Sequence, residues 1–208
     1  MPAQAELFGD ERLPIPAGMR YFNEIISKSH ERELVAYIAN LPLKAFEFAG
    51  GFKGNRRVMS FGWRYDYTAQ QLHQTSPIPD QLAEVRRIAA SRFKVPFEHL
   101  AQALVTEYAP GAGIGWHRDK KMFGEIIGVS LLAPCKFRLR LKKGGMWDRM
   151  SFYAEPRSGY LLSGAARTLW EHSIPPLDQL RYSITFRTLV AAQRTQVQPR
   201  QPTVVKSS

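Results

Sequence analysis

Three residues of metal-ligand type stand out in this chain: His117, Asp119 and, much later, His172. Residues i and i+2 of an extended strand point to the same face, so His117 and Asp119 can converge on one point. An imidazole from another strand would complete two histidines and one carboxylate on one side of a metal, with the other positions open. That ligand set favours non-haem Fe(II) that activates oxygen. The sequence therefore predicts an iron site built from two separate segments.

A second chemical feature is a strand-like segment near the end of the chain that carries two arginines. Alternation predicts one face with Arg181, Ser183, Thr185 and Arg187, and an opposite face with Tyr182, Ile184 and Phe186. If the polar face points outward, the segment is an ordinary solvated strand. If it points into a barrel, two buried guanidinium groups require anions. Asp119 could satisfy one of them, and a dicarboxylate co-substrate could bind the other through the paired geometry of guanidinium and carboxylate.

The sequence after residue 100 predicts a series of short strands, which must position these residues. The candidates are 101–108, 114–119, 125–132, 136–142, 149–153, 159–162, 169–173 and 181–190. Short strands at this spacing, separated by glycine and proline, predict a closed or double-sheet antiparallel architecture such as a jelly roll.

The part of the chain before residue 100 predicts two helices among strands. Apolar residues at helical spacing predict helices over 29–40, with Ser29 as N-cap, and over 80–93. A strand is expected over 21–26. Strands broken by a glycine-rich turn are expected between 45 and 67, followed by a loop over 68–79. The fold class is therefore mostly β with flanking helices.

Length and composition set the domain organisation. With 208 residues and 44% hydrophobic residues, the chain can bury one substantial core. We expect an N-terminal arm over 1–20 and a single domain over 21–190. Helices and substrate-side strands would occupy 21–99, and the jelly-roll core 100–190. The remaining residues, 191–208, are expected to form a disordered basic tail.

The cellular setting follows from what the sequence lacks. No stretch approaches the roughly 20 apolar residues of a membrane span, and the first ten residues do not resemble a secretory signal. The single cysteine, Cys135, excludes a disulfide framework and lies in an apolar stretch, where we expect a buried core residue. We expect a cytoplasmic monomer that does not associate with membranes.

The charge of the chain, +11 at pH 7, indicates anionic partners. Cations cluster at 53–64, at 86–94 and at 136–143, and aromatic residues interleave with the first cluster. Cationic groups meet phosphates and flat rings stack on unpaired bases, so the combination suits nucleic acid. The same rings could instead pack in the core.

The first cluster gives a specific expectation for substrate binding. We expect Lys53, Arg56 and Arg57 to lie on a turn between strands and to contact backbone phosphates beside a target base. One ring of the set Phe61, Trp63 and Tyr65 would stack on that base.

Three separated motifs resemble, in their order, those of the AlkB family of Fe(II)/2-oxoglutarate dioxygenases. They are TEYAPG at 106–111 running into IGWHRD at 114–119, then His172, then RYSITFR at 181–187. The resemblance spans roughly residues 21–189. It implies a double-stranded β-helix, or jelly roll, with two N-terminal helices packed outside, Fe(II) as cofactor, and 2-oxoglutarate and O2 as co-substrates.

The resemblance also implies roles for individual residues. Its iron ligands would be His117, Asp119 and His172; its 2-oxoglutarate-binding residues would be Tyr108 and Arg181, with Arg187 assisting the catalytic site.

Two positions of the 2-oxoglutarate motifs differ from the family pattern. Thr106 and Ser183 replace the family's asparagines. A hydroxyl still donates one hydrogen bond but reaches less far than an amide. We place both residues among those that contact the co-substrate.

The activity that the resemblance implies is oxidative dealkylation of N-alkylated bases in DNA or RNA, most naturally single-stranded. Oxidative decarboxylation of 2-oxoglutarate would give succinate, and hydroxylation of the alkyl carbon would give a hemiaminal that releases an aldehyde. Two alternatives stay open: an oxygenase of the same kind acting on a protein or small molecule, and a non-catalytic nucleic-acid-binding jelly roll. Turnover of 2-oxoglutarate separates the last from the others.

Overall fold

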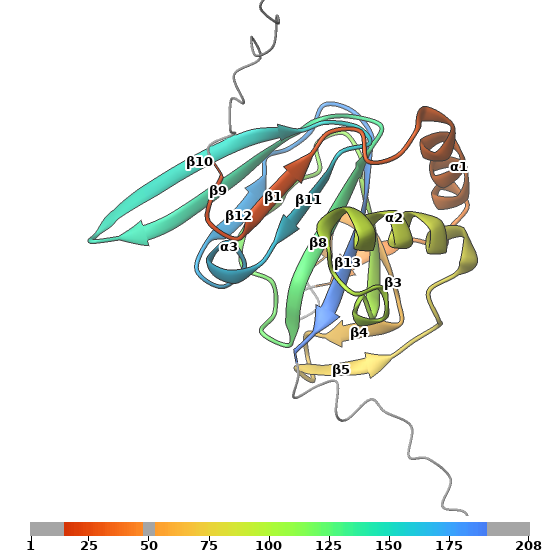
Figure 1. Cartoon of the computed structure of the whole chain (residues 1–208), viewed down its shortest axis with the longest axis horizontal. Helices are drawn as coiled ribbons and strands as arrows, with labels where there is room; N and C mark the ends of the chain where they lie inside the picture. Colours follow the sequence, from red (N-terminus) through yellow and green to blue (C-terminus); the bar gives the residue numbers. More distant parts are fainter. Residues whose placement is uncertain (1–14, 48–52, 191–208) are drawn as a thin grey trace, which may run out of the picture.

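The structure, a computed structural model, describes residues 15–47 and 53–190 and consists mainly of two antiparallel sheets (Figure 1). In spatial order, the larger sheet contains β1 (Met19–Phe22), β11 (Gly159–Leu162), β8 (Phe123–Leu131), β13 (Arg181–Leu189), β6 (Gln102–Tyr108), β3 (Lys53–Phe61) and β2 (Lys44–Glu47). The smaller sheet contains β10 (Met146–Ala154), β9 (Cys135–Lys143), β12 (Glu171–Ile174) and β7 (Ile114–His117). A separate hairpin pairs β4 (Trp63–Asp66) with β5 (Gln71–Gln74). The predicted mostly-β jelly roll is confirmed.

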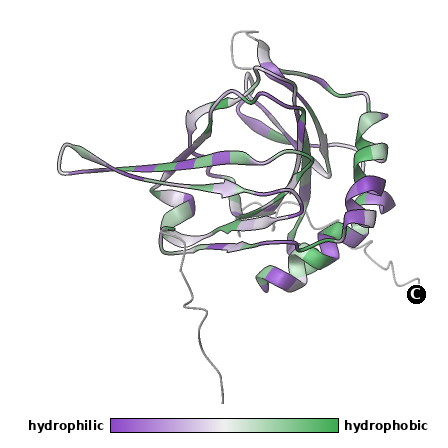
Figure 2. Cartoon of the chain, turned by 90° about the horizontal axis from the view of Figure 1, so that it is seen from above, coloured by the Kyte–Doolittle hydropathy of each residue, from purple (hydrophilic) through white to green (hydrophobic). Residues whose placement is uncertain are grey.

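Two helices cover the outer face of the larger sheet, on the side away from the β9–β10 hairpin (Figures 1 and 2). They are α1 (Lys28–Ala39) and α2 (Ala83–Phe93), the latter preceded by a 3-10 turn over Asp80–Leu82 and followed by another over Phe97–His99. Each buries one apolar stripe, with residues such as Ile38 of α1 and Val85 of α2 fully enclosed. They form one core with Ile184 and Phe186 of β13. Two outer helices were predicted, and this is confirmed.

A second core fills the space between the two sheets. Phe137 and Leu139 of β9, Phe152 of β10 and Tyr160 of β11 are among its buried members. The central strand β13 therefore has one core on each side. Its apolar residues face the helices, and its polar residues face the interior of the roll. The alternative of an outward-facing polar strand is wrong.

Several predicted boundaries were wrong. The N-cap of α1 is Ser27, whose hydroxyl accepts a hydrogen bond from the His30 backbone N–H, so Ser29 lies inside the helix. The first strand runs over Met19–Phe22, not 21–26, and so begins inside the segment expected to be an arm. The loop expected over 68–79 contains β5, and a short helix, α3 (Gly164–Thr168), was not predicted.

The cations expected on a turn instead belong to a strand. Lys53, Arg56 and Arg57 lie in β3, where Arg56 pairs in register with Tyr108 of β6 and Arg57 with Glu107. Successive side chains of a strand point to opposite faces, so Arg56 and Arg57 lie on different faces of the sheet. The turn placement was wrong.

Other expectations lie partly or wholly outside the described residues. These are the arm over 1–14, the centre of the turn at 48–52, and the basic tail over 191–208. Cys135 is buried, as expected. No helix in the described part of the chain is long and apolar enough to cross a membrane.

Candidate active site

The two predicted histidines face each other across neighbouring strands of the smaller sheet. His117 ends β7 and pairs in register with His172 of β12, and their ring centroids are 4.2 Å apart. Asp119 follows β7 in a loop, and its Oδ2 lies 3.5 Å from His172 Nε2. One ligand atom from each of the three side chains lies within 4.8 Å of the others. The structure thus brings together the residues that could hold a metal ion.

Both imidazoles are held in a form that can bind a metal. His117 Nδ1 lies 2.8 Å from the carbonyl oxygen of Gly115, which only accepts, so Nδ1 carries the hydrogen and Nε2 keeps its lone pair. Phe137 stacks on the His172 ring with an interplanar angle of 11°. Burial lowers the pKa of His117 and, with the charge of neighbouring groups, lowers that of His172 to about 3, so both rings are neutral at neutral pH.

Arg187 fixes Asp119. This is the pairing expected if the polar face of the 181–187 strand points into the barrel. Asp119 Oδ1 accepts hydrogen bonds from Arg187 Nε at 3.1 Å and Nη2 at 2.9 Å. Burial alone would raise the pKa of Asp119, but the Arg187 charge and the two histidines hold it well below its usual range. Arg187 Nη1 also donates to Gln102 Oε1 at 3.0 Å, and Gln102 Nε2 donates to the Trp63 carbonyl at 2.7 Å. The carboxylate therefore stays ionised and oriented.

Arg181 presents a guanidinium group with an unused donor to the interior of the roll. The residue is 1% exposed, and its Nε donates to Ser130 Oγ at 3.2 Å. Its Nη1 is one of three buried side-chain N or O atoms in the described part of the chain that have no hydrogen-bond partner. The guanidinium carbon lies 5.1 Å from the centre of the Tyr108 ring. A buried cation with a free N–H fits a carboxylate that binds here.

The two hydroxyl residues that replace the family asparagines lie beside this guanidinium. Thr106 and Ser183 are directly opposite each other in the β6–β13 pairing, and Ser183 is also opposite Ser130 of β8. Both are buried, on the face that Tyr108 and Arg181 share. The sheet thus places small polar groups where a bound dicarboxylate would need hydrogen bonds.

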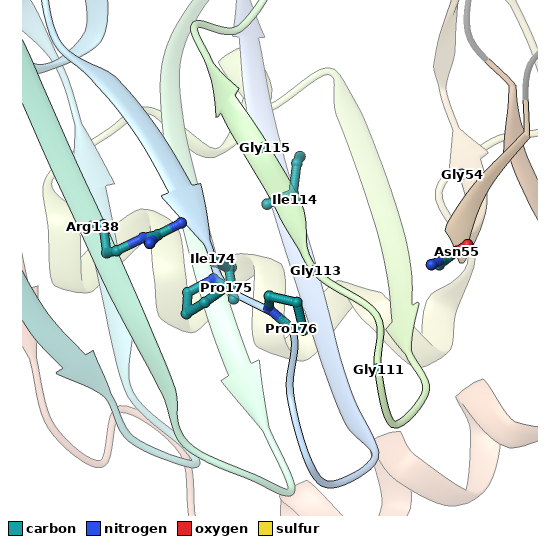
Figure 3. A pocket seen from close by; sticks show the side chains of 10 residues that line it. All are labelled: Gly54, Asn55, Gly111, Gly113, Ile114, Gly115, Arg138, Ile174, Pro175 and Pro176. Carbon is teal, nitrogen blue, oxygen red and sulfur yellow. The ribbon is translucent and has the colours of Figure 1, made fainter.

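The glycine-rich approach to β7 forms one wall of a hollow (Figure 3). Gly111 has φ +82°, which favours glycine, and a Cβ on Gly113 would come within 2.7 Å of the Ile174 carbonyl oxygen. Arg138 and Pro175 line other parts of the hollow, and none of the three candidate metal ligands does. Gly113 therefore allows the chain that enters β7 to approach the end of β12 closely, while Gly111 serves the turn before it.

An aromatic and cationic cluster lies beside the candidate metal ligands. Arg56 is 9% exposed and its guanidinium lies 4.0 Å from the centre of the Phe46 ring. Tyr67 packs edge-on against both Phe46 and Tyr65. Lys120, next to Asp119 in the chain, lies 5.0 and 4.9 Å from the two tyrosine rings. No described ion pair involves Arg56, and burial lowers the pKa of its guanidinium although the charge of Asp119 partly opposes this.

Not all of the predicted substrate residues reach this region. Phe61 is 4% exposed and belongs to the core beneath the helices, so of the three rings proposed to stack on a base only Trp63 and Tyr65 remain candidates. Arg57 points away from the interior and forms a two-pronged ion pair with Glu107, with an Nε–Oε1 distance of 2.6 Å. Trp63 and Tyr65 lie in the β4–β5 hairpin and are half-buried.

Several positioning residues were missed by the sequence analysis. Gln102 and Ser130 orient the two arginines, as described above. Arg167 of α3 donates to the carbonyl oxygens of Lys120, Phe123 and Gly124, which fixes the loop that follows Asp119. Alternation along β6 places Gln102 on the same face as Thr106, so it could have been found. Arg167 carries no such signal, because its partners are backbone atoms 43 to 47 residues away.

Comparisons with known proteins agree with this geometry. The model of the 2OG-Fe(II) oxygenase superfamily matches residues 18–187. The Arabidopsis thaliana protein named alkylated DNA repair protein ALKBH8 homolog is 27% identical over 86% of this chain. The Mus musculus protein named tRNA (carboxymethyluridine(34)-5-O)-methyltransferase ALKBH8 is 28% identical over 83% of it. The chain spans 57% of the first relative and 27% of the second.

Two solved structures share the fold. The structure of OsALKBH1 has a TM-score of 0.66 at 15% identity and covers 84% of this chain and 98% of its own. A prolyl hydroxylase from Trichoplax adhaerens, in complex with a fragment of hypoxia inducible factor, has a TM-score of 0.62 at 13% identity, with 88% of each chain covered. At these identities the likeness concerns the fold alone.

Proposed function

Because this chain belongs to the 2OG-Fe(II) oxygenase superfamily, whose members are dioxygenases that use Fe(II), 2-oxoglutarate and O2, we propose that it oxidatively dealkylates N-alkylated bases in nucleic acid. The observation that carries the proposal is the convergence of the His117, Asp119 and His172 ligand atoms beside a buried, partly unpartnered Arg181. The reacting carbon would gain a hydroxyl as 2-oxoglutarate becomes succinate and CO2, and the hemiaminal would then release an aldehyde.

The iron would be held by His117, Asp119 and His172. Their chemistry fits, because two neutral imidazoles and one carboxylate are the donor set that suits non-haem Fe(II). Arg187 acts as a positioning residue, since it fixes the Asp119 carboxylate and keeps it ionised. When bound, Fe(II) together with 2-oxoglutarate and O2 supplies the oxidising chemistry, and the protein contributes binding and orientation.

The 2-oxoglutarate would be held by Arg181 and Tyr108, with Thr106 and Ser183 beside them. The free Nη1 of Arg181 can donate to the far carboxylate of the co-substrate, which would satisfy a donor that is otherwise buried and unpaired. Tyr108 lies next to Arg181 in the β6–β13 pairing, so its side chain can approach the same ligand.

The aromatic and cationic cluster beside the candidate metal ligands supports a nucleic-acid base as the target. Tyr65, Tyr67 and Phe46 offer flat rings near the candidate metal ligands, and Arg56 and Lys120 offer charge. A base taken out of its stack regains part of the lost stacking on such rings, about 1–3 kcal/mol per base. The names of the two curated relatives refer to alkylated DNA repair and to tRNA modification, so both concern nucleic acid. A cytoplasmic monomer is part of the same proposal.

Succinate formation on a panel of methylated oligonucleotides tests the proposed function. We expect single-stranded DNA or RNA with an N-methylated base to stimulate succinate formation and to release formaldehyde in equal amount. Unmethylated oligonucleotides of the same sequence are the control. Succinate formation that only a protein or small molecule stimulates would identify an oxygenase with another substrate. No 2-oxoglutarate turnover under any condition would favour a binding protein instead.

Arg56 and Arg57 provide a matched pair for testing how the substrate binds. Arg56→Gln is expected to raise the KM for a methylated oligonucleotide about tenfold or more, because charge-assisted hydrogen bonds contribute about 1.5–3 kcal/mol. Arg57→Gln should leave that KM unchanged, since Arg57 lies on the opposite face and its side chain is 54% exposed. Both variants are measured for succinate formation over a range of oligonucleotide concentrations.

The 2-oxoglutarate dependence of the same variants completes this test. Arg56→Gln should not alter it if Arg56 serves the substrate. Should the requirement for 2-oxoglutarate rise while the oligonucleotide KM stays constant, Arg56 belongs to the co-substrate site next to Tyr108. Equal effects of the two substitutions on the oligonucleotide KM would contradict the assignment of Arg56.

A further inference from the structure

The outer face of the smaller sheet carries a band of cations and aromatic rings that the proposed active site does not use. Alternation and burial place Phe137 and Leu139 of β9 inside, so the residues between them point outward. With their partners in β7 and β10, they form what we call the outer basic face: Trp116, Lys136, Arg138, Arg140, Lys142, Trp147, Arg149 and Tyr153. The β9–β10 hairpin that carries most of these residues projects from the body of the protein (Figures 1 and 2).

The guanidinium groups of this face are held by stacking. Arg138 lies 5.0 Å from the Trp116 ring, and Arg140 lies 4.4 Å from Trp116 and 4.2 Å from Trp147. Arg138 Nε donates to Ser173 Oγ at 3.0 Å, which leaves its other N–H groups free in the described contacts. Stacked guanidinium planes lose little conformational freedom when their edges bind a ligand. The face is therefore arranged in advance for binding anions.

The charge of the outer basic face is nearly unopposed. Glu171 is its acidic neighbour in the sheet and is already bound to Arg140, with an Nε–Oε2 distance of 2.7 Å. No described ion pair involves Lys136, Lys142 or Arg149, and all three are exposed. Cations this close repel one another on a bare surface, so an anionic partner stabilises the arrangement.

The spacing of the charges suits a polymer. Lys136, Arg138, Arg140 and Lys142 lie two residues apart along β9, which places their Cα atoms about 7 Å apart in a row. This is comparable to the spacing of successive phosphates in an extended single strand. Tyr153, 60% exposed, and the half-buried Trp147 add ring faces on which unpaired bases can stack. A double helix would hide its bases from these rings.

The face is directly connected to the candidate active site. Trp116 precedes His117 and Glu171 precedes His172. One face of these strands therefore carries the candidate metal ligands, and the other face carries residues of the outer basic face and its acidic neighbour. β7 is an edge strand of the smaller sheet, and a strand of nucleic acid lying across the outer basic face can pass over this edge to the metal site. We propose that the outer basic face binds the backbone of single-stranded nucleic acid and holds it while one base enters the site. This inference rests on the proposed function for the identity of the polymer.

Salt-dependent binding tests the proposal without depending on catalysis. The probe is a fluorescently labelled 20-nucleotide single-stranded RNA without methylation, and anisotropy is measured against salt concentration. The triple variant Lys136→Gln, Lys142→Gln and Arg149→Gln removes three exposed cations. The slope of log K against log salt should fall in magnitude by about 2, because each phosphate contact with a single strand contributes about 0.7.

A control variant removes the same charge from the opposite side of the molecule. Lys28, Arg32 and Arg87 are exposed on α1 and α2, so replacing all three with glutamine should leave the slope unchanged. Trp147→Ala tests the stacking: we expect about a fivefold or greater loss of affinity at unchanged slope. Thermal unfolding of each variant shows whether the sheet is intact.

The outcomes separate the two levels of the proposal. An unchanged slope in the β9–β10 variant, or an equal decrease in the control, overturns the outer basic face as the binding surface. If the slope falls as expected but no methylated oligonucleotide is turned over, the surface stands and the proposed dealkylation fails. If dealkylation occurs and the slope is unchanged, the proposed function stands and the outer basic face is not the binding surface.

Discussion

Replacing Asp119 with alanine is expected to abolish succinate formation. The substitution removes the carboxylate from the candidate ligand set and leaves two neutral imidazoles, which balance none of the charge of Fe(II). The loss should exceed the roughly 10- to 100-fold decreases typical of residues that only orient metal ligands. Iron content after gel filtration and succinate formation are the two measurements. Near-normal values of both would contradict the assignment of Asp119 as a ligand.

The same substitution has a structural effect that must be separated from the chemical one. Asp119→Ala leaves Arg187, whose side chain is 11% exposed, with Gln102 as its remaining described hydrogen-bond partner and with the Phe123 ring beside its guanidinium. Removing one member of a buried ion pair costs about 3–5 kcal/mol. Asp119→Asn keeps an oxygen that can accept from Arg187, so it should lose activity with a smaller decrease in Tm. Asp178→Ala, at an exposed position, is the control for both measurements.

Replacing Arg181 with lysine is expected to raise the 2-oxoglutarate concentration required for half-maximal turnover about 10- to 100-fold. Lysine keeps the charge but cannot bond Ser130 and a carboxylate at once in the planar geometry of a guanidinium group. The expected range corresponds to about 1.5–3 kcal/mol for a charge-assisted contact. Calorimetric binding of 2-oxoglutarate in the absence of oxygen measures the effect directly.

A surface arginine provides the control for this measurement. The Arg157 side chain pairs with Glu24 and Glu31, and only its backbone N–H reaches Ser130, by a bond to the Ser130 carbonyl. Arg157→Lys keeps that backbone bond, so it should leave 2-oxoglutarate binding unchanged. If Arg181→Lys also binds 2-oxoglutarate normally, the carboxylate site lies elsewhere, and the free Nη1 of Arg181 needs another explanation.

The metal site could be predicted because its signals are local. The alternation along 181–187 follows from strand geometry without knowledge of the partner strands. The short spacing of His117 and Asp119 was enough to propose both as ligands of one metal ion. Only the inward direction of the arginines was left open, and this depends on the helices that cover the other face of β13. Asp119 itself lies in a loop after β7, so the extended strand predicted through residue 119 was wrong, although the two side chains do converge. Arg187 fixes the Asp119 carboxylate there.

The substrate side could not be predicted as well, because its arrangement depends on pairing between distant strands. Arg56 and Arg57 look alike in the sequence, and only the register of β3 against β6 sends one to the interior and the other to Glu107. Phe61 was one of three candidate rings for stacking on a base, but the helices cover it, and periodicity does not show which face of a strand will be covered. Similarly, nothing in the sequence connects Arg167 with the loop after Asp119.

The position of β13 has a consequence for how the protein folds. It is the last strand of the described residues in chain order, yet it lies in the middle of the larger sheet, between β8 and β6. The two halves of that sheet can join only after β13 has inserted, and β1 must also find β11 across most of the chain, since Met19 pairs with Leu162. Such long-range pairing slows folding. Because β13 supplies both Arg181 and Arg187, a nascent chain gains its two guanidinium anchors only at the final step of assembly.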